Sequence, residues 1–210
     1  MGSLPKTLAG CIALLFVLTS GAAFAGPLHD AARTGDAALI QVLFDAGADL
    51  DERDSAGETP LMLSAFAANW RTLDRLVMLG ADVTARDNDG LLAIHWAVFA
   101  GAPIAVARLL GGKSPPDAAL AMMDDARNTL GVTPLMLAAQ LNHPRLVASL
   151  IFSGADLEIV DRHGQTALTA AADEGNDEIV YLLLKGGAAC QATDPVWFDE
   201  CTKRKSALGL

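Results

Sequence analysis

The sequence predicts an all-α solenoid of about five helix-turn-helix units joined by hairpin loops. A short segment, "GETPLMLSA" at 57–65, returns as "GVTPLMLAA" at 131–139 and more weakly as "GQTALTAAA" at 164–172. Gly57 and Gly90 lie 33 residues apart. A fixed period of this size indicates stacked copies of one small unit, none of which buries its apolar faces alone.

Composition indicates the kind of helix packing, and net charge excludes some binding partners. The 210 residues are 52% hydrophobic but only 5% aromatic, so the apolar mass is mostly Ala, Leu and Val. Such residues suit thin, closely packed helices. The formal net charge of −10 makes nucleic acid and anionic membrane surfaces unfavourable partners, because neither attracts an acidic surface.

The first 25 residues have the pattern of a cleavable signal peptide. Lys6 is followed by an apolar run at 8–18 and by small residues ending in Ala-Phe-Ala. The run is short for a bilayer span, so a retained membrane anchor is the weaker alternative. The segment "LAGC" at 8–11 imitates a lipoprotein motif, but its apolar region follows the cysteine instead of preceding it. We expect cleavage after Ala25 and export to the periplasm, with full secretion as the alternative.

Each unit is predicted to contain two helices. Thr-Pro at 59–60 and at 133–134 opens the first helix, because Thr caps it and Pro fits its first turn. An apolar stripe such as 179–184 marks the second helix. A glycine in left-handed conformation is expected to end each second helix. These glycines are Gly47, Gly80, Gly154 and Gly187.

The 33-residue period, the Thr-Pro-Leu segments, the paired alanines and the Gly-Ala-Asp triplets together resemble the ankyrin repeat, over about 28–189. The resemblance implies a scaffold that binds another protein and has no enzymatic activity. It also places His29 and His95 at the family's histidine position, where hydrogen bonding between adjacent turns outweighs a metal-binding or catalytic role. The chain is similar to exported bacterial ankyrin proteins, some of which are associated with catalase function and peroxide resistance.

The repeat pattern divides the chain into a signal peptide, an array, an enlarged finger and a C-terminal cap. The interval from Gly90 to Gly131 is 41 residues, eight more than the period. The extra residues indicate a partly helical finger between the third and fourth units, or simply a tolerated surface insertion. The predicted boundaries are 1–25 for the signal peptide, 26–189 for the array (units 26–56, 57–89, 90–113, 128–163 and 164–189), 114–127 for the finger, and 190–210 for the cap and tail.

The C-terminal segment is expected to cover the open end of the last unit. Cys190 and Cys201 are the two cysteines of the mature chain, and in an exported protein such a pair indicates one disulfide. Trp197 and Phe198 lie between them and are predicted to pack on the last helices.

Ankyrin arrays bind through the first helix and the hairpin tip of each unit, which form a concave surface. The positions that the family leaves variable on this surface are polar in the outer units and apolar in the middle ones. An exposed apolar stripe of this kind indicates contact with a partner. The alternative is that Leu120, Met122 and Met123 of the finger cover it. The predicted partner-binding residues are Leu63, Phe66, Leu91, Trp96, Phe99, Val132, Leu137 and Leu141.

Catalytic and metal-binding patterns are missing from the sequence. It contains no G-x-S-x-G, no H-E-x-x-H, no paired-cysteine metal site and no phosphate-binding glycine loop. We therefore expect no cofactor, no metal and a monomer that binds another protein. An immunity or inhibitor protein that neutralises a basic toxin or enzyme is the second reading, and a hydrolase or redox enzyme built on the scaffold is the third.

Overall fold

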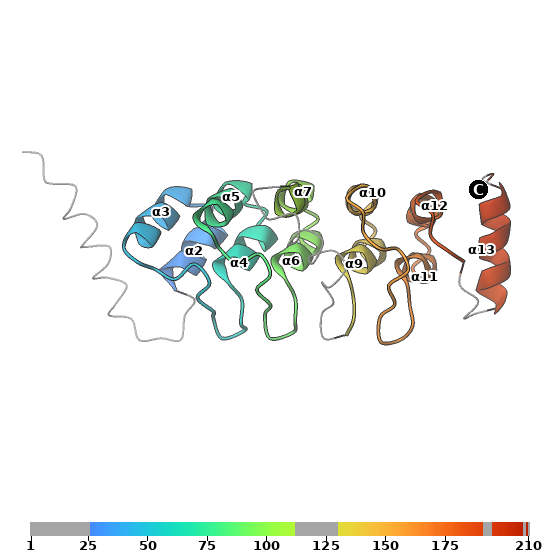
Figure 1. Cartoon of the computed structure of the whole chain (residues 1–210), viewed down its shortest axis with the longest axis horizontal. Coiled ribbons are helices and arrows are strands. Elements are labelled where there is room, and N and C mark those ends of the chain that lie inside the picture. The colour runs from blue at the N-terminus through green and yellow to red at the C-terminus, as the bar shows by residue number, and fades with distance from the viewer. Residues whose placement is uncertain (1–25, 112–129, 191–194, 208, 210) are drawn as a thin grey trace, which may run out of the picture.

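The computed structural model describes residues 26–111, 130–190, 195–207 and 209, and within these ranges all regular structure is helical. The helices form two rows along an elongated array (Figure 1). The first row holds α2 (Pro27–Thr34), α4 (Pro60–Phe66), α6 (Ala93–Phe99), α9 (Pro134–Gln140) and α11 (Ala167–Asp173). The second row holds α3 (Ala37–Asp45), α5 (Trp70–Leu79), α7 (Pro103–Gly111), α10 (Pro144–Phe152) and α12 (Asp177–Lys185).

The predicted all-α solenoid of paired helices is confirmed over these residues. Three other predictions lie outside the described part of the chain. They are the signal peptide at 1–25, the finger at 114–127 with its methionines, and the packing of the Trp197 and Phe198 side chains.

The first helix of a unit begins at a capped turn. The hydroxyls of Thr59 and Thr133 accept the backbone N–H of the residue three positions later, at 3.4 and 3.2 Å, and a proline follows each threonine. In return the sulfur atoms of Met62 and Met136 accept the backbone N–H of the capping threonine, at 3.4 and 3.5 Å. Each cap therefore satisfies two backbone donors that the helix itself leaves free.

A tight turn with one left-handed residue joins the two helices of each unit. Glycine takes this position at Gly35, Gly101 and Gly175, with φ between 60° and 87°. Ala68 and Asn142 take it in the second and fourth units, with φ of 54° and 56°. A residue with a Cβ is disfavoured in this conformation by about 1–2 kcal/mol, and asparagine tolerates it better than alanine.

Replacing Ala68 with glycine is expected to stabilise the protein. The substitution removes the Cβ strain at φ 54°, and the greater freedom of glycine in the unfolded chain offsets part of the gain, which leaves about 0.5 kcal/mol. Urea unfolding measures the change, with Asn142→Gly as the matched control that gains nothing. A lower free energy of unfolding for Ala68→Gly would contradict the assignment of strain to this turn.

Small residues in the first row allow its helices to approach one another. Ala65, Ala139 and Ala171 are fully buried at these crossings. Larger apolar residues of the second row, such as Leu73 and Leu150, fill the space behind them. The result is one continuous core that runs through every unit, so each unit depends on its neighbours for stability.

Buried histidines tie neighbouring units together. Nε2 of His29 lies 3.0 Å from the carbonyl oxygen of Glu58, and Nε2 of His95 lies 3.3 Å from that of Val132. A carbonyl oxygen only accepts hydrogen bonds, so each imidazole donates from Nε2 to the hairpin of the next unit. The predicted structural role of both histidines is confirmed.

A C-terminal helix, α13 (Pro195–Ala207), stands at the end of the array and runs across both rows (Figure 1). A disulfide joins Cys201 of this helix to Cys190, and the buried Cys201 belongs to the core. The guanidinium of Arg204 pairs with the carboxylate of Asp177 at 2.6 Å. These contacts attach α13 to the last unit.

Candidate functional site

Phe66 of α4 and Trp96 and Phe99 of α6 form an aromatic cluster on adjacent first-row helices. The ring centroids of Phe66 and Trp96 lie 5.4 Å apart at an interplanar angle of 86°, which is an edge-to-face contact. Those of Trp96 and Phe99 lie 6.1 Å apart. Phe66 is 52% exposed and Phe99 is 43% exposed, so the outer two rings of the cluster face solvent.

The central ring of the cluster is fixed by a buried carboxylate. The indole N–H of Trp96 donates to Oδ2 of Asp87 at 3.0 Å. Oδ1 of Asp87 accepts the backbone N–H groups of Asp89 and Leu91, at 2.9 and 2.8 Å. The hairpin before α6 therefore sets the orientation of the Trp96 ring, against which Phe66 and Phe99 pack.

The other predicted residues differ in burial. Leu141, just after α9, is exposed. Leu63, Leu91 and Val132 are half-buried, and Leu63 and Val132 pack against the core. Leu137 is less exposed than predicted: it is only 8% exposed and belongs to the core. The exposed surface thus consists of the aromatic cluster and Leu141, with the half-buried residues as its floor.

Carboxylates border the aromatic cluster at the hairpin tips. Partial burial raises the pKa of Glu58, and the negative charges of Asp54 and Asp87 raise it further. His29 has a smaller, opposite effect on this pKa. The hairpins before α4 and α6 therefore carry negative charge next to Trp96, and Arg53 and Arg86 of the same hairpins offset part of it.

Removing the charge of Glu58 is expected to stabilise the protein at neutral pH. A carboxyl whose pKa is higher in the folded than in the unfolded chain binds protons more readily when folded, so its ionisation lowers stability as the pH rises. Glu58→Gln should raise Tm at pH 7 by about 1 °C, since solvent screens the effect. The gain should vanish below pH 4.5, the ordinary pKa of this group. A gain that persists at low pH would contradict the electrostatic cause, and Glu174→Gln provides an exposed control.

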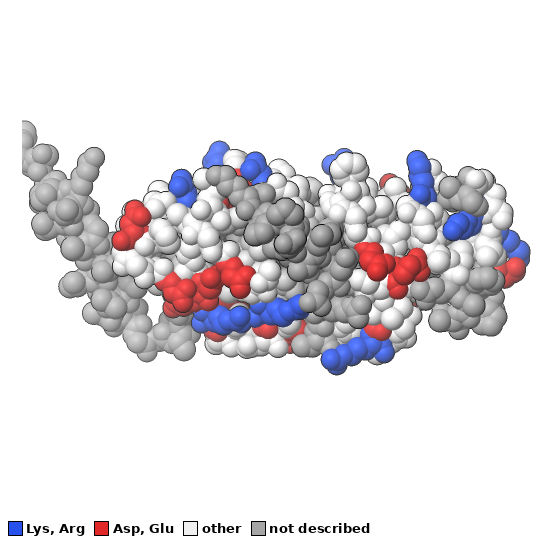
Figure 2. Space-filling model, viewed as in Figure 1, with Lys and Arg blue, Asp and Glu red and all other residues white. Residues whose placement is uncertain are grey.

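Acidic side chains gather beside α2 and α4 and again beside α11 (Figure 2). Oδ1 of Asp51 accepts the backbone N–H of Asp82, and Oε1 of Glu158 accepts that of Ala189, both at 2.8 Å. Burial raises the pKa of Asp51. Both carboxylates join one hairpin to the next, so they have a structural role.

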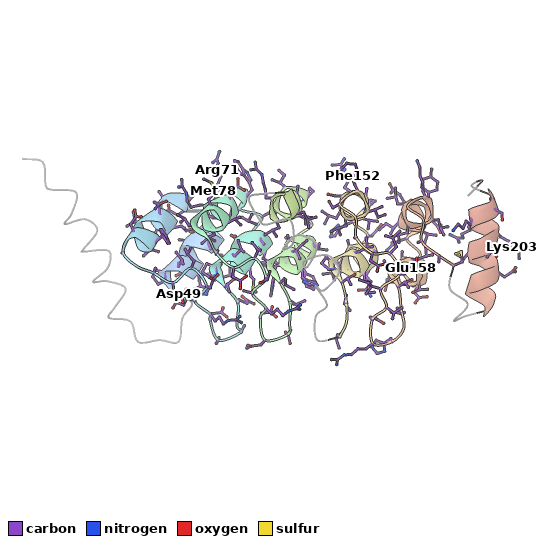
Figure 3. The ribbon with its side chains drawn as sticks, viewed as in Figure 1. Asp49, Arg71, Met78, Phe152, Glu158 and Lys203 are labelled. Carbon is purple, nitrogen blue, oxygen red and sulfur yellow. A yellow bond between two sulfur atoms is a disulfide. The ribbon has the colours of Figure 1, made fainter. Side chains whose placement is uncertain are left out.

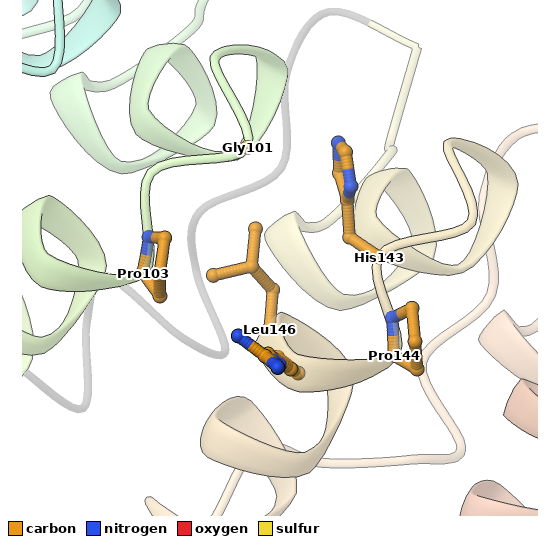
Figure 4. Close-up of a pocket in the computed structure, with 6 residues that line it drawn as sticks. Gly101, Pro103, His143, Pro144 and Leu146 are labelled. Carbon is orange, nitrogen blue, oxygen red and sulfur yellow. The ribbon is translucent and has the colours of Figure 1, made fainter.

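A pocket of about 390 Å³ lies between the third and fourth units, and the sequence did not predict it (Figure 4). A Cβ on Gly101 would lie 3.1 Å from Cε1 of His143, so the glycine leaves room for the imidazole. Among the described residues of the pocket's lining, His143 and Arg145 have titratable side chains, and none has a nucleophilic hydroxyl or thiol or a carboxylate. The lining is formed by Gly101, Pro103, His143, Pro144, Arg145 and Leu146.

Several apolar side chains on the second row are also exposed. Phe152, at the end of α10, is 94% exposed, and Met78 of α5 occupies the matching position (Figure 3). The corresponding residues of α3 and α12 are Asp45 and Lys185, so the position is a solvent-facing one. Aligning the repeats at this position would have predicted the exposure of Phe152 and Met78.

The described residues offer neither a metal-binding cluster nor a membrane-spanning helix. In the described residues, no three His, Cys, Asp or Glu side chains come close enough to hold a metal ion. None of the helices in the described ranges is both long and apolar enough to span a bilayer. Among the described residues, aromatic ring contacts join Phe66, Trp96 and Phe99, two of which are exposed.

Known proteins share the repeat pattern. The chain is similar to Neurogenic locus notch homolog protein 2 of Homo sapiens, with 38% identity over 181 residues, which cover 85% of this chain and 7% of that protein. It is also similar to Neurogenic locus notch homolog protein 1 of Mus musculus, with 36% identity over 152 residues, which cover 72% of this chain and 6% of that protein. The chain thus spans 7% or less of the length of these curated relatives.

The family model for "Ankyrin repeats (3 copies)" matches residues 28–119 and 106–194. These matches cover the paired helices, the Thr-Pro caps and the hairpins described above. The chain belongs to the ankyrin-repeat family.

Proposed function

We propose that this protein is a non-enzymatic binding module that docks another protein on the aromatic cluster and Leu141. One observation carries the proposal: Phe66 and Phe99 are half exposed beside a Trp96 ring that Asp87 holds in place. Exposed aromatic side chains in a fixed arrangement are the usual anchors of protein interfaces, because they bury much apolar area at little entropic cost.

The surroundings of the aromatic cluster support a partner of defined chemistry. Glu58 and Asp87 lie at one border, and Asp173, the last residue of α11, and Glu174, which follows it, lie at the other end of the first row. The whole chain carries a formal charge of −10. A partner segment that combines apolar side chains with flanking Lys or Arg would fit both features, because opposite charges speed and orient association.

We also propose a compartment for this protein and a first candidate partner. The signal-peptide pattern at 1–25 and the disulfide between Cys190 and Cys201 support export to the periplasm, where disulfides persist. The resemblance to exported ankyrin proteins associated with catalase makes a peroxide-removing enzyme the first partner to test. The acidic charge also supports a second candidate, inhibition of a basic toxin or enzyme.

Affinity capture with matched variants tests the proposal. The mature chain is immobilised, incubated with periplasmic extract, and its bound proteins are identified and then measured one at a time. Phe66→Ala with Phe99→Ala should reduce capture of the specific partner at least tenfold, because both anchors are lost. Met78→Ala with Phe152→Ala removes apolar residues of the second row that are more exposed than Phe66 and Phe99, and this pair of substitutions should leave capture unchanged. Wild-type capture by the Phe66→Ala, Phe99→Ala variant would refute the proposed surface. Loss of capture only in the Met78→Ala, Phe152→Ala variant would also refute it.

A further inference from the structure

The first unit lacks a hydrogen bond that the other four units share. In each of those four, the residue three positions after the helix cap accepts the backbone N–H of the cap residue. Counted by position, the corresponding pair in the first unit is Gly26 and His29. Nδ1 of His29 is buried and has no hydrogen-bond partner among the described residues. The four observed bonds run from Thr59 to Met62, Leu92 to His95, Thr133 to Met136 and Thr166 to Thr169.

The buried Nδ1 atom of His29 needs a hydrogen-bond donor. Its Nε2 donates to the carbonyl oxygen of Glu58 at 3.0 Å, so the ring proton is on Nε2 and Nδ1 is left as an acceptor. His29 is only 1% exposed. A buried acceptor without a donor is unfavourable.

By repeat position, the backbone nitrogen of Gly26 corresponds to the donor of the other four units, and a peptide N–H there has only one proton. That proton's direction is set by φ, which is −63° at Gly26 and between −90° and −97° at the other caps. The single N–H of Gly26 is thus rotated about the N–Cα bond relative to the other caps, and Nδ1 of His29 receives no hydrogen bond from it. A nitrogen with three protons has no such restriction.

A carboxylate also lies against Gly26. A Cβ placed on this glycine would be 2.8 Å from Oε2 and 3.0 Å from Oε1 of Glu52, a residue of the first hairpin. The nitrogen and the Cβ position are both bonded to the same Cα, so they are about 2.5 Å apart. The Glu52 carboxylate is therefore within reach of a charge on the Gly26 nitrogen.

We infer that Gly26 is the first residue of the mature protein and that Glu52 and His29 form a binding site for its α-ammonium group. Hydrolysis of the Ala25–Gly26 peptide bond by a signal peptidase adds one water. The hydroxyl goes to the Ala25 carbonyl carbon, which becomes a carboxylate, and protons go to the Gly26 nitrogen, which becomes an ammonium group. One proton of this group then bonds to Nδ1 of His29 and another to the Glu52 carboxylate.

The helix that follows opposes a positive charge at this place, and the acidic neighbours offset that cost. A cation at the N-terminus of α2 is unfavourable because the helix dipole is positive there. Glu52 faces this end of α2 from the hairpin, and Asp30, whose carboxylate also pairs with Arg33, lies in the first turn. Replacing Glu52 should therefore lower Tm more in the processed chain than in a chain whose ammonium group is displaced.

Two measurements test the inference. First, the full-length chain is expressed in a bacterium that exports it, and the N-terminus of the mature protein is sequenced, where Gly26 is the expected first residue. Second, four purified chains are compared by thermal unfolding: one that starts at Gly26, one that starts at Ala25, and each of these with Glu52→Gln. The one-residue extension displaces the ammonium group but keeps every described helix.

The extension is expected to lower Tm by about 2–4 °C. Glu52→Gln should lower Tm by a similar amount in the chain that starts at Gly26 and by much less in the chain that starts at Ala25. A mature protein that begins at another residue would overturn the inference. Equal Tm values for the two starting points, or an equal effect of Glu52→Gln on both, would also overturn it. None of these results depends on the binding partner, so the proposed function is tested separately.

Discussion

Replacing Trp96 with alanine is expected to weaken partner binding by about 30-fold or more and to lower the free energy of unfolding by about 3 kcal/mol. Binding falls because the central anchor is lost and because Phe66 and Phe99 lose the ring that orients them. Stability falls because the edge-to-face contact is lost and the buried Asp87 loses its indole donor. Titration calorimetry and urea unfolding measure the two effects on the same sample.

Conservative variants separate the two effects. Trp96→Phe keeps a ring next to Phe66 but removes the N–H, so it should retain most of the binding and lose about 1–2 kcal/mol of stability. Asp87→Asn should cost both stability and affinity, because its amide group replaces an acceptor of three hydrogen bonds. Full binding by Trp96→Ala would show that the aromatic cluster is only structural.

Removing the disulfide is the second large effect that we expect. Replacing Cys190 and Cys201 with serine should lower the free energy of unfolding by about 3 kcal/mol, because the bond closes a loop of 11 residues in the unfolded chain. The loss should fall mainly on α13, which then keeps only contacts such as the Arg204–Asp177 pair. Unfolding of the oxidised wild type and of the double variant in urea measures the change.

The reduced wild-type protein is the control for this pair. It should unfold at the same urea concentration as the double serine variant, since both lack the bond. Partner binding should be unchanged in either form, because α13 is at the end of the array, remote from α4 and α6 (Figure 1). An equal free energy of unfolding with and without the bond would show that α13 contributes no cooperative stability.

Local chemistry explains why most of the fold could be predicted from the sequence. A Thr-Pro pair determines where a first helix starts, as at Thr59, and a glycine such as Gly80 determines where a second helix ends. The repeat period then shows which residues share a face, so the exposure of Phe66 and Phe99 could be predicted as well. These features depend on a few neighbouring residues, which any single copy of the repeat contains.

Features that depend on the distance between units could not be predicted. Leu137 occupies the same position in its unit as Trp96, yet it is in the core. The hydrogen bond from Trp96 to Asp87 and the pocket at Gly101 and His143 likewise depend on how two elements meet. Sequence pattern assigns a residue to a face, but packing between neighbours decides how deeply it is buried.

Hydrogen exchange of the backbone amides, measured with and without the captured partner, tests the central claim most directly. The account predicts added protection in α4 and α6 and at the turns that follow Phe66 and Phe99, with little change in α3, α5 and α12. Protection confined to the second row, around Met78 and Phe152, would contradict it and would place the binding surface on the opposite row of helices.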